Sequence, residues 1–141
     1  MGGEGETPVK VGLDTSVVLR LLTGEPRPLA EAAWQAVVET RLAGGQAAVS
    51  DLVVSEAYFA LQHHYAVPKE LALRQLRALF ESGDLVAAGS AAQVLATPGL
   101  ATAKPGFVDR MIHAAYMHNL DEMLTFEKAA SKLPHTRVLG D

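Results

Sequence analysis

The 141-residue chain contains no cysteine. Disulfide bonds, thiolate catalysis and cysteine-ligated zinc are therefore excluded. The chain also lacks an apolar run near the ~20 residues that span a bilayer. Residues 1–8 are acidic and glycine-rich, whereas an export signal is basic and then apolar. These absences predict a soluble, cytoplasmic protein with no membrane contact.

Basic residues are also few, with 12 Lys and Arg against 16 Asp and Glu and a formal net charge of -4. A protein that holds nucleic acid by charge alone usually has a strongly basic surface. An enzyme that acts on nucleic acid is still allowed, because cations bound in an acidic pocket supply local positive charge. Seven basic residues could form a patch beside such a pocket, although a solvated helix surface is the simpler explanation for most of them: Lys69, Arg74, Arg77, Lys104, Arg110, Lys128 and Lys132.

Several catalytic motifs are missing. The serines lack a G-x-S-x-G elbow, and there is no Walker-type or G-x-G-x-x-G loop for a nucleotide. Histidine-bound zinc is not favoured either, because His63 and His64 are adjacent while His113 and His118 lie five residues apart. We expect each of these histidines at the surface or at an edge.

Length and a hydrophobic content of 49% predict one domain over residues 9–141, preceded by a disordered tail over residues 1–8. Short apolar segments alternate with stretches of helical periodicity. The predicted strands cover residues 9–13, 47–49, 85–88, 123–126 and 138–139. The predicted helices cover residues 15–22, 29–43, 51–65, 69–80, 91–96, 107–118 and 127–133. This βα alternation favours an α/β fold with a parallel sheet covered by helices on both faces.

Four carboxylates interrupt otherwise apolar segments: Asp14, Glu56, Asp109 and Glu127. Asp14 and Glu127 each follow a predicted strand, and ligands of open α/β sheets bind at the carboxyl ends of the strands. We therefore expect the four acids to converge on one edge of the sheet. Carboxylates grouped in this way suit a magnesium or manganese ion, and two such ions about 4 Å apart can activate a water against a phosphodiester.

Each acid also has a purely structural explanation. Asp14 can cap the helix that follows it, and Asp109 and Glu127 fall in first helical turns, where the helix dipole favours an acid. Glu56 is predicted to lie on a largely apolar helix face, where a salt bridge or a hydroxyl group can satisfy it. The hydroxyls of Thr15, Ser16 and Thr125 lie beside the acids and can orient a carboxylate or a water.

Four segments, taken in order, resemble those of the PIN-domain ribonucleases, and of the VapC-type toxins among them: residues 13–16, 54–57, 106–109 and 124–127. The resemblance extends from residue 9 to residue 139. It implies a PIN-like three-layer α/β/α fold with a central, mostly parallel sheet of four to five strands. It also implies an endoribonuclease that depends on Mg²⁺ or Mn²⁺ and serves as the toxin of a toxin-antitoxin pair. The partners implied are an RNA substrate, a small antitoxin protein and a second copy in a homodimer.

The resemblance assigns Asp14, Glu56 and Asp109 as catalytic, metal-binding carboxylates. The fourth family position is commonly aspartate, and Glu127 stands there in this chain. Hydrolysis in this family leaves a 5′-phosphate and a 3′-hydroxyl. Three of the basic residues lie near the acids in sequence and are candidates for phosphate contacts: Lys104, Arg110 and Lys128.

Two alternatives stay open. Glu127 favours a PIN-like interaction module that has lost its chemistry. A strand that ends in Asp14 followed by Thr15 also fits an aspartate-dependent phosphotransfer domain. Such domains usually carry another acid close to the aspartate, whereas this chain has Ser16.

Overall fold

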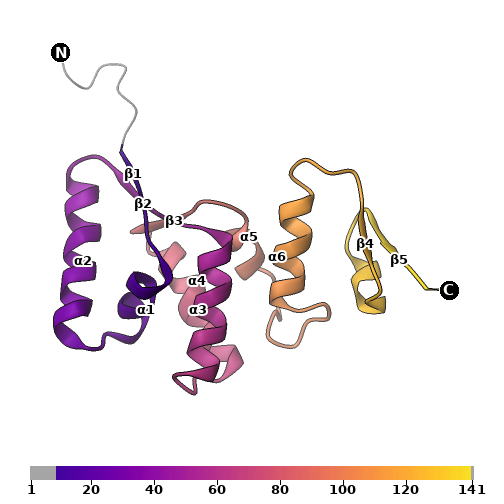
Figure 1. Ribbon diagram of the computed structural model, residues 1–141, viewed down its shortest axis with the longest axis horizontal. Coiled ribbons are helices and arrows are strands. Elements are labelled where there is room, and N and C mark those ends of the chain that lie inside the picture. The colour runs from indigo at the N-terminus through magenta and orange to yellow at the C-terminus, as the bar shows by residue number, and fades with distance from the viewer. Residues whose placement is uncertain (1–8, 141) are drawn as a thin grey trace, which may run out of the picture.

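A computed structural model describes residues 9–140, so the tail predicted over residues 1–8 lies outside the described residues. Helices and strands alternate as the sequence predicts (Figure 1). The strands are β1 (Lys10–Gly12), β2 (Gln46–Val49), β3 (Leu85–Ala87), β4 (Met123–Thr125) and β5 (Thr136–Val138). The helices are α1 (Thr15–Thr23), α2 (Arg27–Leu42), α3 (Asp51–His63), α4 (Lys69–Glu81), α5 (Ala91–Leu95), α6 (Phe107–Tyr116) and the 3₁₀ helix η1 (Lys128–Lys132).

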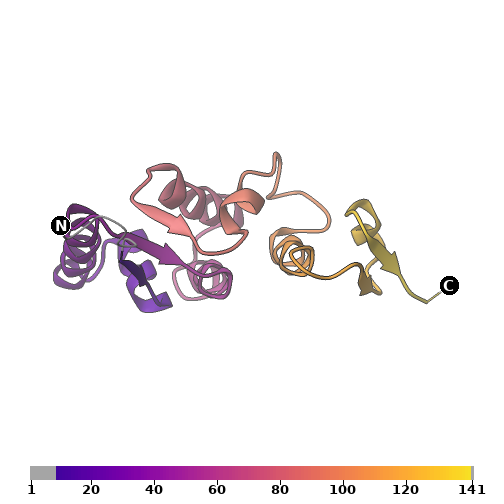
Figure 2. The same ribbon diagram turned by 90° about the horizontal axis from the view of Figure 1, so that it is seen from above.

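Every strand pairing is parallel, which confirms the predicted α/β fold class. The five strands divide between two sheets, one in the order β1-β2-β3 and one formed by β4 and β5. Figures 1 and 2 show the β4–β5 pair on the far side of α6 from the three-stranded sheet. The predicted last strand therefore pairs with β4, and the second sheet is separate from the first.

The main core lies between the three-stranded sheet and the helices around it. Its largest fully buried side chains include Leu61, Leu76 and Leu85. Phe107 from α6 is also fully buried, and its ring centroid lies 4.9 Å from that of Tyr58 in an edge-on contact. This contact fixes the N-terminal half of α6 to the main core.

Local signals set the helix boundaries. The Ser50 hydroxyl accepts a hydrogen bond from the Val53 amide at 3.2 Å and caps α3, as the sequence predicts. Gly24 ends α1 with φ of 71°, a left-handed conformation that glycine adopts without a steric penalty. No helix within residues 9–140 is long and apolar enough to cross a membrane.

The β4–β5 pair is attached to α6 through His113. This side chain is only 7% exposed, and its Nε2 donates to the Pro134 carbonyl at 2.7 Å. The expectation that His113 lies at the surface or at an edge is therefore wrong. The helical pattern around residue 113 did not show that a second sheet would cover it.

Candidate active site

Asp14 lies two residues beyond the end of β1, at the carboxyl end of that strand. Its Oδ1 accepts hydrogen bonds from the Ser16 hydroxyl at 2.7 Å and from the Val17 amide at 3.3 Å. The hydrogen bond from Ser16, and to a smaller extent the one from Val17, holds the pKa of this exposed carboxyl below its ordinary value. Asp14 thus caps α1 and also presents a fully ionised carboxylate to solvent at neutral pH.

Glu56, on α3, is joined to the start of α1. Its Oε1 accepts a hydrogen bond from the Thr15 hydroxyl at 2.7 Å, which is the hydroxyl partner considered from the sequence. The helix face that carries Glu56 is solvated, because Leu52 is 71% and Phe59 is 46% exposed. The prediction of an apolar setting for Glu56 is wrong, since α3 buries a different face, formed by Val54, Ala57, Tyr58 and Leu61.

Asp109 and Glu127 form a second pair. Both line a hollow of about 200 Å³ between α6 and the β4–β5 pair. Asp109 lies in the first turn of α6, as predicted. Glu127 follows β4, and its amide donates to the Thr125 hydroxyl at 3.0 Å, so this hydroxyl keeps its own proton to donate toward the hollow.

The four acids therefore form two pairs in one chain and not a single cluster. Within residues 9–140, no three acidic or histidine side chains lie close enough together to hold one metal ion. The expectation that all four converge fails because Asp14 follows β1 whereas Glu127 follows β4, and these strands belong to different sheets. Each pair still supplies exposed carboxylate oxygens with neighbouring hydroxyls, which is the donor chemistry that Mg²⁺ and Mn²⁺ prefer.

Comparison with known protein families finds a match over most of the chain. The PIN domain family model matches residues 11–135, which include all four acids. The chain belongs to the PIN domain family. PIN domains are typically nucleases and usually bind divalent metal ions, and the parallel α/β architecture is consistent with their three-layer fold. Comparison with curated proteins finds no match, and neither does comparison with solved structures.

This PIN domain contains a further acid at a strand-to-helix step, which the sequence analysis did not single out. The Asp51 carboxylate accepts hydrogen bonds from the Ser90 amide at 2.9 Å and the Ala91 amide at 3.0 Å. It therefore caps the start of α5 from the neighbouring helix. Its position directly after Ser50, at the end of β2, was the signal available in the sequence.

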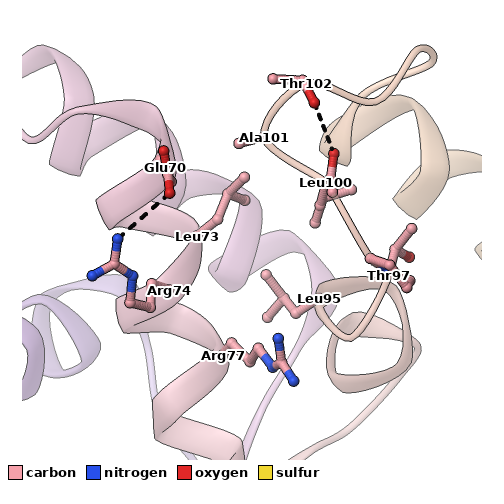
Figure 3. A pocket seen from close by; sticks show the side chains of 11 residues that line it. Glu70, Leu73, Arg74, Arg77, Leu95, Thr97, Leu100, Ala101 and Thr102 are labelled. Atoms are coloured by element: carbon pink, nitrogen blue, oxygen red, sulfur yellow. Dashed lines mark hydrogen bonds and ion pairs between the residues drawn. The ribbon is translucent and has the colours of Figure 1, made fainter.

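A further hollow in this PIN domain lies away from the acids. It measures about 350 Å³ and opens between α4 and the loop over residues 97–102 (Figure 3). Arg74 and Arg77 line it, and they form ion pairs with Glu70 at 3.6 Å and Glu81 at 3.2 Å. These two arginines therefore belong to a solvated, charge-paired helix surface, which was the simpler explanation for them.

The three basic candidates for phosphate contacts differ in their surroundings. Arg110 uses its Nε to donate to the Pro105 carbonyl at 2.7 Å, which closes the turn before α6. Lys104 and Lys128 are exposed, and Lys128 follows Glu127 directly. The two lysines are therefore better placed than Arg110 to meet a phosphate.

Proposed function

We propose that this PIN domain is a metal-dependent endoribonuclease that hydrolyses RNA phosphodiester bonds, and that it is the toxin of a type II toxin-antitoxin pair in the cytoplasm. The observation that carries the proposal is the hydroxyl-supported carboxylate pair at the end of β1. Ser16 holds Asp14 and Thr15 holds Glu56, each at 2.7 Å. Both carboxylates are exposed, so a cation or an RNA phosphate can reach them.

The roles of the four acids follow from their chemistry. Asp14, Glu56, Asp109 and Glu127 would hold Mg²⁺ or Mn²⁺ through carboxylate oxygens. A bound ion of this kind neutralises phosphate charge and lowers the pKa of water. The Ser16 and Thr15 hydroxyls restrict the Asp14 and Glu56 carboxylates, so less conformational entropy is lost when a ligand binds. Glu127 reaches further than an aspartate at that position by one methylene group.

The substrate would be a single-stranded segment of a structured RNA, whose backbone and bases are accessible. Lys104 and Lys128 would contact its phosphates. The net charge of -4 favours a small antitoxin whose binding segment carries basic groups. A basic or hydrophobic antitoxin segment lying over Asp14 and Glu56 would block the site.

The decisive experiment is RNA cleavage by the purified full chain with Mg²⁺, with sequencing of the ends produced. We expect internal cleavage that leaves 5′-phosphates, and a loss of at least about 100-fold in Asp14→Asn, since even groups that only support a metal ligand contribute 10–100-fold. Asp121→Asn is the matched control, because Asp121 is also exposed but precedes β4. Equal cleavage by wild type and Asp14→Asn would refute the proposal.

Metal binding can be measured without activity. Titration with Mn²⁺, followed by its paramagnetic resonance signal, should show binding to wild type and Asp121→Asn and weaker binding to Asp14→Asn and Glu56→Gln. For the toxin role, expression should arrest growth, and co-expression of a small protein encoded beside this chain should relieve the arrest. If growth continues although the nuclease is active and no antitoxin is present, the toxin role is refuted while the nuclease function stands.

The rival functions give different results. A non-catalytic interaction module would show no cleavage in wild type with either metal. A phosphotransfer domain would form an adduct with beryllofluoride at Asp14. The Ser16 hydroxyl donates to that carboxylate at 2.7 Å, whereas phosphotransfer domains usually carry a second acid at this place.

A further inference from the structure

Four strands have an edge without a partner strand within residues 9–140, and two of these, β1 and β4, are each followed by an acid of the candidate site. β1 pairs only with β2, and β4 pairs only with β5. The outer edges of β1 and β4 therefore present rows of unpaired backbone N–H and C=O groups. Edges of this kind are templates for pairing with another strand.

The two edges match in length and in the position of their acids. β1 and β4 each contain three residues, and each is followed by an acid two residues beyond its last residue, Asp14 after Gly12 and Glu127 after Thr125. If β4 adds to β1 in parallel, Lys10 faces Met123 and the two acids meet at the same edge of the joined sheet. The two carboxylate pairs would then form one site.

Exposed apolar side chains lie on and beside both edges. Val9 is 69% exposed and Val11 is 38% exposed at β1, while Leu124 is 51% and Phe126 is 76% exposed at β4. Apolar groups collected beside an unpaired strand mark a surface that another chain covers. Joining the two edges would place these side chains beside one another and reduce their contact with water.

The path of the chain determines which copy supplies β4. Helix α6 is fixed to the main core by buried Phe107 and Met111, and it is fixed to the β4–β5 pair by the bond from His113 to the Pro134 carbonyl. Figure 1 shows α6 between the two sheets, with β4 far from β1. To bring β4 to β1 of the same chain, one of these two sets of contacts must break. A second copy can reach β1 with both sets intact.

We propose that two copies of this chain exchange their β4–β5 pairs, with β4 of each copy adding in parallel to β1 of the other. Each complete site then takes Asp14 and Glu56 from one copy and Asp109 and Glu127 from the other. A two-fold axis lets both copies make the same exchange, so the β1 and β4 edges of both copies are closed. The joint site rests on the nuclease function proposed above, but the strand exchange does not.

Mixing inactive variants tests the shared site. Asp14→Asn and Asp109→Asn are unfolded together and refolded, so that heterodimers form with one intact site. Activity should return to about one quarter of wild type, since half of the dimers are mixed and each has one intact site of two. The matched control mixes Asp14→Asn with Glu56→Gln, which lie in the same half of the site, and it should stay inactive. No recovery in the first mixture, with wild type active, would overturn the shared site.

Covalent trapping tests the exchange without any activity. The chain has no cysteine, so Val11→Cys and Leu124→Cys introduce the only thiols, on the two edges. A short bifunctional thiol reagent should join the two single variants to each other when they are mixed, giving a species of twice the chain mass under denaturing conditions. The double variant should give the same dimer. A link within one chain, or no link, would overturn the exchange even if the nuclease function holds.

Discussion

Replacing Asp51 tests whether an acid at a strand-to-helix step is structural. The Asp51→Ala variant leaves the amides of Ser90 and Ala91 without an acceptor, and these residues are 6% and 0% exposed. A buried donor without a partner costs about 1–3 kcal/mol. Because Asp51 itself is half-buried, water can reach part of the gap, so we expect the free energy of unfolding to fall by about 2–4 kcal/mol in total. For a chain of this size that corresponds to a fall in Tm of about 6–15 °C.

The assay is urea denaturation followed by far-UV circular dichroism. Asp51→Asn keeps one acceptor oxygen and should lose only about 1 kcal/mol. It should also bind Mn²⁺ and cleave RNA like wild type, unlike Asp14→Asn. The structural role of Asp51 is refuted if the free energy of unfolding of Asp51→Ala lies within about 0.5 kcal/mol of the wild-type value, or if Asp51→Asn abolishes Mn²⁺ binding.

Three further outcomes follow from the same structure. A Cβ at Gly89 would lie 2.5 Å from Oδ2 of Asp51. Gly89→Ala should therefore displace that carboxylate and lower the free energy of unfolding by about 2 kcal/mol. In denaturation curves, the Gly89→Ala change should lower stability little further when Asp51→Ala is already present. Phe107→Ala removes a buried ring from the main core and should cost about 3–5 kcal/mol, with faster amide exchange in α6. The Asp14 carboxyl should titrate by NMR below the ordinary 3.8, and Ser16→Ala should raise its pKa toward that value. The pKa of Asp14 is lower in the folded chain than in the unfolded chain. Its contribution to folding stability is therefore complete above the ordinary carboxyl range and is lost as the pH falls through the folded pKa. A shift of the Asp14 pKa in the opposite direction, or additive losses at Gly89, would contradict these assignments.

Much of the fold could be predicted from the sequence because strand and helix signals are local. Apolar alternation, helical periodicity, and capping residues such as Ser50 depend on neighbours a few residues away. The observed helices begin and end within two residues of the predicted ones. Parallel pairing also followed from the βα alternation, since parallel strands need a crossover between them.

Part of the candidate site was visible in the same way. The positions of Asp14 and Glu127 after strands, and of Asp109 in a first helical turn, are properties of short segments. The structure confirms all three positions. The metal, the RNA and the antitoxin stay predictions, because their recognition depends on groups outside this chain.

The amino-acid sequence by itself determined which segments form strands and helices, and which acids follow the strands. Only the tertiary structure decided how those acids group. The sequence did not show that β4 pairs with β5 away from β1, that His113 becomes buried under Pro134, or that Asp51 serves amides 39 residues away. The physical reason is that a helical or strand pattern in the sequence shows only which side of an element is apolar. Which strand pairs with each strand edge, and which group binds each carboxylate, depends on packing between distant segments.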